Sequence, residues 1–252
     1  MNTALSMAST VSGKRSSRGF TLVEMLVVIS IVSLLSILVS TGFQSIMGSV
    51  EDGQVSDIAS TFSRARAYAM ANNTYVFVGI QEVNASNPSG GAQTTGIGRI
   101  ALSVMASSDG TKGYPTSIAA STPLTSLTVV SPVRHYDNLH LLTSAGTGIP
   151  NQLPSTATSV TTSNVGSSTS LTTFTWPLGS TTPQYPTFGS NGSVIQFNPQ
   201  GQAQIMTGPF TDSVLQWIEV DLAPTHGTSI STKNPATILI DGASGSVAVY
   251  RE

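Results

Sequence analysis

The sequence of 252 residues contains no cysteine and little charge. Without cysteine neither a disulfide framework nor a thiolate metal site can form, so apolar side chains must hold any folded part together. Asp, Glu, Lys and Arg make up only 9% of the chain, whereas roughly 25% is usual in soluble proteins. Clusters of Lys and Arg, which neutralise phosphates, are scarce, and we therefore expect no nucleic-acid partner.

Recognisable catalytic motifs are also missing. The sequence has no nucleophile elbow, zinc-protease helix, P-loop or dinucleotide fingerprint. The nearest approach to a ligand cluster is "RHYDNLH", where a strand would place His135 and Asp137 on one side and His140 on the other. We therefore assign no catalytic residue, no metal site and no cofactor, and we expect a protein that is not an enzyme.

What the sequence does have is one long apolar run, residues 20–42. As a helix it would span about 34 Å at 1.5 Å per residue, enough for a hydrocarbon core of about 30 Å. The basic residues Lys14, Arg15 and Arg18 precede it, and the positive-inside rule places this flank in the cytoplasm. The run therefore predicts a single membrane span, with the rest of the chain on the far side.

Glu24 is the only charged residue in this run, and a carboxylate costs roughly 2.5 to 3.5 kcal/mol at the centre of a membrane and less near its edge. A secretory signal peptide fits poorly, because the run is long and no small-x-small cleavage site follows. A plain signal anchor explains the length and the basic flank but leaves Glu24 without a purpose. A third interpretation is a leader that ends at Gly19 and is cut before Phe20.

The stretch "RGFTLVEMLVVISIVSLL" resembles the type III signal of type IV prepilins and pseudopilins. The resemblance implies that a prepilin peptidase cuts after Gly19 and methylates the new α-amine of Phe20. Gly19 has no Cβ, so its backbone can enter a peptidase cleft closely. The resemblance also implies that Glu24, fifth in the mature chain, pairs with the N-terminal amine of a neighbouring subunit. The alternative is that Glu24 merely reaches the headgroups.

Four serines, Ser30, Ser33, Ser36 and Ser40, share one side of the predicted membrane helix. Small side chains let membrane helices approach closely. Serine hydroxyls also often bond the carbonyl of the preceding turn. The sequence leaves both interpretations open.

Residues 43–72 are predicted to continue the helix with an apolar face. Apolar side chains recur mostly three or four positions apart, which is typical of a helix that packs on a sheet. They are Phe43, Met47, Val50, Val55, Ile58, Phe62, Ala65 and Ala69. Gly42, Gly48 and Gly53 each weaken a helix by roughly 1 kcal/mol relative to alanine. We therefore predict one long helix that is soft between residues 42 and 53.

The remainder is predicted to be a β-rich head. Runs of β-formers bounded by turn residues predict strands at 75–80, 99–105, 126–131, 138–143, 170–176, 193–198, 201–206, 214–222, 236–241 and 246–250. Tight hairpins are predicted at 198–201 and 241–245. The segment 144–169 is long for a structureless connection, so it is either a mobile surface loop or an insertion. The fold class is α+β, a long N-terminal helix packed on an antiparallel sheet, as in pilins.

Two looser resemblances concern the head. The segments "SRARAYAMANNTYVFVGI" and "FNPQG" are similar to the GspH/FimT-type minor pseudopilins. The signal, "VRHYDNLHLL" and "ILIDGASGSVAVYR" together resemble the family called Verru_Chthon cassette protein D. The first resemblance implies a hairpin that returns to the sheet near the C-terminus.

We therefore predict a leader at 1–19, a membrane and assembly helix at 20–42, an amphipathic helix at 43–72 and a head at 73–252. The expected function is that of a minor pilin or pseudopilin in a type II secretion pseudopilus or a type IV pilus-like filament. Its expected partners are the prepilin peptidase, other pilin or pseudopilin subunits and the bacterial inner membrane, with the head in the periplasm before assembly. The alternative is a permanently anchored β-domain that binds a ligand or an adhesion target.

Overall fold

The computed structural model describes residues 20–113, 122–143, 161–167, 170–190, 192–207, 216–231 and 234–251, and it gives no side-chain detail for 37–51, 161–163 and 216. The predicted leader, 1–19, and most of the segment 144–169 lie outside the described residues. The chain divides into two compact units, Met1–Gly48 and Ser49–Glu252. Each unit is considered separately below.

The predicted long helix is confirmed as α1 (Leu22–Asn72), which begins in the first unit and ends in the second. The boundary between the units falls between Gly48 and Ser49. This boundary lies within the stretch 42–53 that the glycines mark as soft. The side chains of Phe43, Met47 and Val50 lie outside the described residues.

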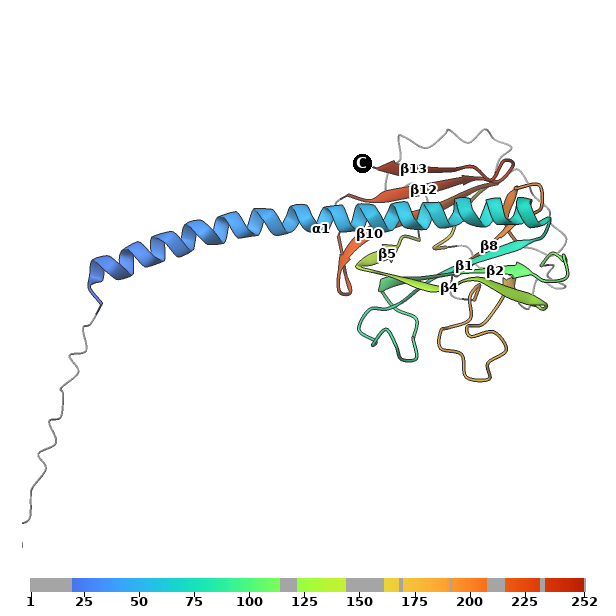
Figure 1. The fold of residues 1–252 in the computed structure, drawn as a ribbon, viewed down its shortest axis with the longest axis horizontal. Helices are drawn as coiled ribbons and strands as arrows, with labels where there is room; N and C mark the ends of the chain where they lie inside the picture. Colours follow the sequence, from blue (N-terminus) through green and yellow to red (C-terminus); the bar gives the residue numbers. More distant parts are fainter. Residues whose placement is uncertain are drawn as a thin grey trace, which may run out of the picture. The chain divides into compact units, whose positions relative to one another are not determined.

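The second unit combines the end of α1 with three sheets (Figure 1). The first sheet has the order β4-β2-β1-β8-β9, and its strands are β1 (Val76–Asn84), β2 (Gly98–Ser107), β4 (Leu127–Asp137), β8 (Gly192–Phe197) and β9 (Ala203–Ile205). The second sheet has the order β11-β10-β12-β13, with β5 and β6 also paired to β10. Its strands are β5 (Leu139–Leu141), β6 (Thr161–Asn164), β10 (Gln216–His226), β11 (Ser229–Ile230), β12 (Ala236–Asp241) and β13 (Val247–Arg251). The third pairs β3 (Thr122–Pro123) with β7 (Thr172–Thr173).

The main core lies between the far half of α1 and the first two sheets. The predicted apolar face of the helix is confirmed, because Val55, Ile58, Phe62, Ala65 and Ala69 are all buried. They share one cluster with side chains from both sheets. Figure 1 shows β12 and β13 on one side of the helix and β1, β2 and β4 on the other. The helix thus shields both sheets from water, which is the dominant stabilising contribution to such a fold.

A second core covers the opposite face of the first sheet. Side chains alternate along β1, so Val76 and Val78 enter the main core while Phe77 points to the other face. There Phe77 meets Phe174 and Phe188 from the segment 170–190. Because both faces are covered, every residue of β2 is buried. Its apolar side chains accordingly enter both cores, with Ile100 in the main core and Ala101 in the second.

Gly79 in β1 is needed for this second core. The rings of Phe174 and Phe188 stack over it with centroids 4.9 Å apart, and a Cβ on Gly79 would lie 2.5 Å from Phe174 Cζ. We expect Gly79→Ala to lower the free energy of unfolding by about 1 to 3 kcal/mol through overpacking. Chemical denaturation of the full chain in detergent measures the change.

Gly53 is the matched control for that substitution. It lies in α1, and a Cβ there would meet nothing within 4 Å. Gly53→Ala should therefore raise the free energy of unfolding by up to about 1 kcal/mol, the helix propensity difference between the two residues. Equal effects at the two glycines would contradict the packing argument.

Most predicted strands are confirmed, with three corrections. The strand expected at 170–176 is reduced to β7 and an isolated bridge between Phe174 and Phe188. The strands β3, β6 and β11 were not predicted, because they are only two to four residues long. β3 and β6 form by pairing with distant strands, whereas β11 pairs with the end of β10 in a tight hairpin. The head is also not wholly antiparallel, since β3 pairs with β7 and β6 with β10 in parallel.

Both predicted hairpins are confirmed, and the structure brings them together. They join β8 to β9 and β12 to β13. Gly201 and Gly245 occupy the turns with φ of 82° and 66°, a region that glycine adopts without steric cost. The amide of Ala203 donates to the carbonyl oxygen of Gly242 at 2.8 Å, which ties one hairpin to the other.

Candidate functional site

The helix α1 begins with a reciprocal hydrogen-bonded cap around Glu24. The amide and the hydroxyl of Thr21 each donate to Oε2 of Glu24 at 2.9 Å, and the amide of Glu24 donates to Oγ1 of Thr21 at 3.2 Å. This is a capping box, in which a Thr before the helix and a Glu three residues later satisfy free backbone amides. A carboxylate at this end also complements the positive end of the helix dipole. Glu24 therefore has a local structural role.

The sequence itself carries the signal for this cap. Threonine followed three residues later by glutamate, just before an apolar run, marks a helix start. "TLVE" at 21–24 has this spacing. The bond between Glu24 and Thr21 could therefore have been predicted from this spacing.

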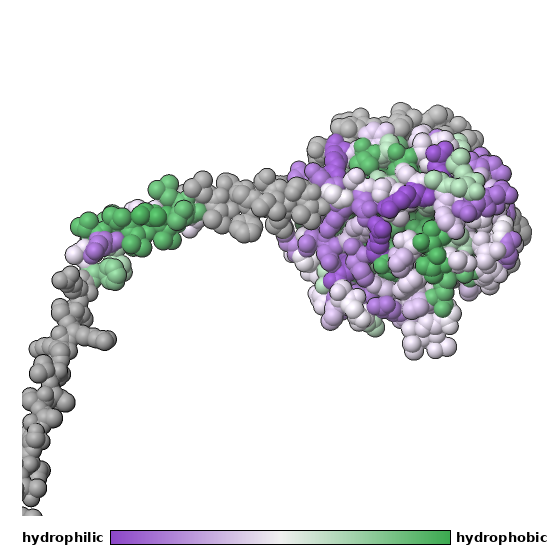
Figure 2. All heavy atoms as spheres, viewed as in Figure 1, coloured by the Kyte–Doolittle hydropathy of each residue, from purple (hydrophilic) through white to green (hydrophobic). Residues whose placement is uncertain are grey.

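Beyond the cap, the described part of the first unit is a continuous apolar surface. Every large apolar side chain between residues 20 and 35 is exposed, from Leu22 at 81% to Val27 at 49%. Figure 2 shows this segment as mostly hydrophobic, with a hydrophilic spot near its start. Exposed apolar area of this extent indicates a surface that contacts lipid or other apolar helices.

The serines on this helix bond their own backbone. The hydroxyls of Ser30, Ser33 and Ser36 donate to the carbonyl oxygens of Leu26, Ile29 and Val32, each at 2.8 Å. Their hydroxyls are therefore satisfied without another chain, as the second interpretation predicts. Ser40 lies outside the residues with described side chains. These bonds do not change the small size of the serine side chains, which lets another helix approach closely.

Of the residues that the sequence singles out at the N-terminus, the structure describes only Phe20 and Glu24. Phe20 is exposed and lies two residues before the first helical residue, Leu22. Lys14, Arg15, Arg18 and Gly19 lie outside the described residues. Among the described residues, no helix is both long and apolar enough to cross a membrane. Residues 37–42 of the predicted span have no described side chains.

The comparison with known families agrees with this geometry. Residues 14–40 match the family described as the prokaryotic N-terminal methylation motif. The chain thus carries a type IV prepilin-like signal, which is typical of membrane-anchored pilins and pseudopilins that a prepilin peptidase processes for assembly with other pilin subunits. No curated protein and no solved structure matches the chain.

The three candidate metal ligands of "RHYDNLH", His135, Asp137 and His140, enter separate interactions. His135 meets the hydroxyl of Tyr185 at 2.7 Å between Nε2 and Oη. Asp137 accepts from Nε of Arg99, and His140 lies 2.9 Å from both carboxylate oxygens of Glu82. His135 and Asp137 sit opposite Ala101 and Arg99 on one side of the sheet, as the sequence predicts. No three His, Asp or Glu residues in the described part are grouped to hold a metal ion.

Burial favours the neutral forms of His135 and Tyr185. Burial lowers the pKa of His135, and the nearby charge of Arg99 lowers it further. Burial likewise raises the pKa of Tyr185. The pair is therefore neutral near pH 7, and its hydrogen bond ties β4 to the segment 170–190.

Sequence reasoning missed a charged cluster where α1 meets β4. The carboxylate of Asp57 accepts from Tyr136 Oη at 2.7 Å, from Arg134 Nη1 at 3.0 Å and from Arg64 Nη2 at 3.2 Å. The Tyr136 hydroxyl and the Arg134 guanidinium hold the pKa of Asp57 below its usual value. Burial and the Asp57 carboxylate raise the pKa of Tyr136 to about 12. Only the seven-residue spacing of Asp57 and Arg64 was visible in sequence.

A second group that the sequence did not single out is a pair of buried acids on β10. Asp221 is fully buried and accepts from Asn164 Nδ2 at 2.6 Å and from Thr237 Oγ1 at 2.5 Å. Glu219, two residues earlier on the same side of the strand, is 5% exposed, and its Oε2 has no hydrogen-bond partner among the described residues. Burial raises the pKa of Glu219, and the charge of Asp221 raises it further.

We expect Glu219 to make the head less stable as the pH rises. A folded-state pKa above the unfolded one means that the folded head holds this proton more tightly. Its stabilising effect is therefore complete below about pH 4.5, the unfolded pKa, and is lost as the pH rises through the folded pKa. Glu219→Gln should remove this pH-dependent loss of stability. Near pH 7 it should raise the free energy of unfolding by on the order of 1 kcal/mol, because a buried carboxylate oxygen without a partner is costly.

Chemical denaturation of wild type and Glu219→Gln between pH 4 and pH 7 measures this effect. The difference between the two chains isolates Glu219 from the other titrating groups. A difference in the free energy of unfolding that is independent of pH would contradict the expected protonation.

Proposed function

We propose that the protein is a minor pilin or pseudopilin of a type II secretion pseudopilus or a type IV pilus-like filament, of the GspH/FimT kind. The match of residues 14–40 to the N-terminal methylation motif carries this proposal. In it, a prepilin peptidase binds the basic leader residues Lys14, Arg15 and Arg18, cuts between Gly19 and Phe20, and methylates the Phe20 amine. The role is structural and not enzymatic.

The local geometry around Phe20 supports this order of events. The predicted cut lies directly before the first turn of α1. It would create a positive amine near the positive end of the helix dipole, which is unfavourable without an anion. The Glu24 carboxylate is the nearest charge in the sequence that offsets it.

Glu24 also retains an oxygen for a second subunit. Its Oε2 accepts both bonds from Thr21, whereas Oε1 makes no hydrogen bond with any described residue. In lipid an isolated carboxylate is penalised, and pairing relieves the cost. We propose that Oε1 accepts from the Phe20 amine of a neighbouring subunit, and that this pair sets the register of the exposed apolar helices.

Before assembly, the proposal places the protein in the bacterial inner membrane as a single-pass chain. The basic flank stays in the cytoplasm and the head, with its two apolar cores, lies in the periplasm. The helix then leaves the bilayer with the growing filament, where other subunits cover its apolar surface.

Mass spectrometry of the protein from its native cells tests this function. We expect the mature chain to begin at N-methylated Phe20. We further expect Gly19→Leu to leave residues 1–19 attached in nearly all molecules, because a side chain there would block close entry of the backbone into the peptidase. Gly13→Leu, which changes another leader glycine, is the matched control and should be processed normally. A mature chain that retains Met1 would instead support a permanently anchored domain.

A further inference from the structure

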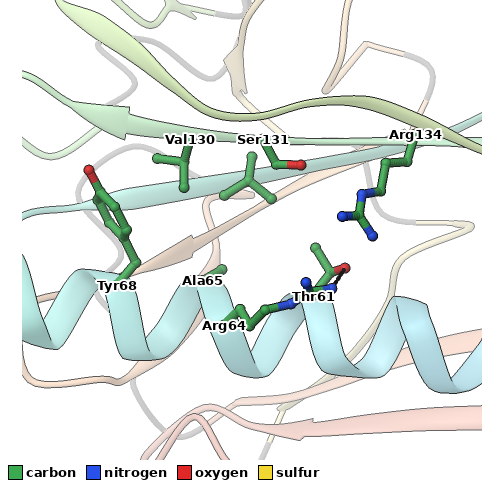
Figure 3. Close-up of a pocket in the computed structure, with 8 residues that line it drawn as sticks. Thr61, Arg64, Ala65, Tyr68, Val130, Ser131 and Arg134 are labelled. Atoms are coloured by element: carbon green, nitrogen blue, oxygen red, sulfur yellow. Dashed lines mark hydrogen bonds between the residues drawn. The ribbon is translucent and has the colours of Figure 1, made fainter.

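The head contains an open pocket between α1 and β4. Its volume is about 300 Å³. Thr61, Arg64 and Tyr68 line it from the helix, and β4 supplies the opposite wall (Figure 3). Figure 3 shows Arg64 and Arg134 near one end of the pocket and Tyr68 at the other. The site therefore combines cationic groups with an aromatic and apolar surface.

Two irregularities in β4 build the wall of this pocket. In a regular strand, the consecutive Val130 and Ser131 would face opposite sides. Here the pairing with β2 skips Val130 and shifts again before Arg134. As a result Val130, Ser131 and Arg134 all line the same pocket. Bulges at sheet edges often redirect side chains toward a site in this way.

The charges at the pocket are not balanced. Arg64 and Arg134 both bind Asp57, so two guanidinium groups share one carboxylate. Arg134 reaches Asp57 through Nη1 alone, and Nη1 of Arg64 has no hydrogen bond among the described residues. Both arginine side chains remain open to solvent, with exposed fractions of 58% for Arg64 and 42% for Arg134. The cluster thus has room and donors for one more carboxylate.

We propose that this pocket binds an acidic side chain of a neighbouring filament subunit. The carboxylate bonds the two guanidinium groups, whose planar donors suit carboxylates. The apolar residue beside it packs against Val130 and Tyr68. This proposal rests on the proposed function and adds a contact between heads to the contact between helices.

The shape of the pocket favours a protein side chain over a small molecule. Sites for small ligands enclose most of the ligand surface, whereas here both arginines stay accessible. Removal of the leader would leave seven basic and twelve acidic residues in this chain. Each copy of the chain therefore carries more acidic than basic residues, while this cluster has more guanidinium groups than carboxylates. Such complementarity between surfaces steers association and selects the partner.

Photocrosslinking in filament-forming cells tests the proposal. The full chain carries p-benzoylphenylalanine in place of Tyr68, which is 36% exposed, or in place of Ile230 on β11 as a control site. We expect the crosslinker at position 68 to form an adduct with a filament subunit. The crosslinked peptide of that subunit should contain Asp or Glu. The Ile230 position should give a different adduct or none. An adduct with a protein outside the filament would overturn the proposal.

Two substitutions of the cluster decide whether charge holds the contact. Arg134→Gln should lower the adduct yield about tenfold, as expected when one member of a close ion pair is lost. Asp57→Asn removes the competing carboxylate and should keep or raise the yield. A loss in both variants, or in neither, would overturn the proposal. Filament recovery is measured in the same cells. If processed protein is present in filaments but gives no adduct from position 68, the pocket contact is refuted while the proposed function stands.

Discussion

Glu24→Gln and Glu24→Ala are expected to be cleaved after Gly19 like wild type and to enter filaments about tenfold less often or worse. The structure makes the glutamine variant informative. Glutamine can replace glutamate in a capping box, so the bonds with Thr21 can persist while the charge is removed. The expected loss therefore measures charge pairing, for which a tenfold effect corresponds to about 1.4 kcal/mol. Immunoblots of sheared filaments and membranes measure it.

Thr21→Ala is the complementary variant. It removes the hydroxyl that bonds Glu24 and weakens the helix start by about 0.5 to 2 kcal/mol, but it keeps the carboxylate. If pairing dominates, this variant assembles far better than Glu24→Gln. The reverse order, with Glu24→Gln near wild type and Thr21→Ala defective, would show that Glu24 serves only as a cap.

Phe62→Ala is expected to lower the free energy of unfolding of the head by about 3 to 5 kcal/mol. Phe62 is fully buried in the middle of the helix face that contacts both sheets. A loss of this size is a large part of the 5 to 15 kcal/mol that stabilises a typical domain. Chemical denaturation of the full chain in detergent, followed by near-ultraviolet circular dichroism, measures the change.

Ser63→Ala on the same helix is the matched control. Ser63 is exposed, and its hydroxyl donates to the carbonyl oxygen of Ala59. A surface change of this kind should alter stability by no more than about 0.5 kcal/mol. A small loss for Phe62→Ala, similar to that of Ser63→Ala, would mean that the helix contributes little to the stability of the head.

Much of the fold was accessible to prediction because local rules govern it. The helix follows from apolar spacing, and Val55, Ile58 and Phe62 are buried as that spacing requires. Both hairpins follow from turn residues that the turns need, such as Gly201 and Gly245. The strands β3 and β6 escaped prediction because pairing with a distant partner, and not their own sequence, forms them.

The candidate sites also differ in whether their residues are close together or far apart in the sequence. The cap at Thr21 and Glu24 depends on residues three apart, and its pattern is legible in the sequence. The cluster of Asp57, Arg64 and Arg134 is different, because its members are up to 77 positions apart. Nothing in either segment predicts that β4 would lie beside this turn of α1.

The sequence by itself determined the prepilin-like signal, the long helix and the hairpins, because each depends on short-range spacing, charge order and turn chemistry. Only the tertiary structure decided that Gly79 must lack a side chain beneath two stacked rings, and that Glu219 is buried beside Asp221. It alone also decided that an irregular edge strand opens a cationic pocket against the helix. Burial and cross-strand register set these features, and both arise from contacts between distant parts of the chain.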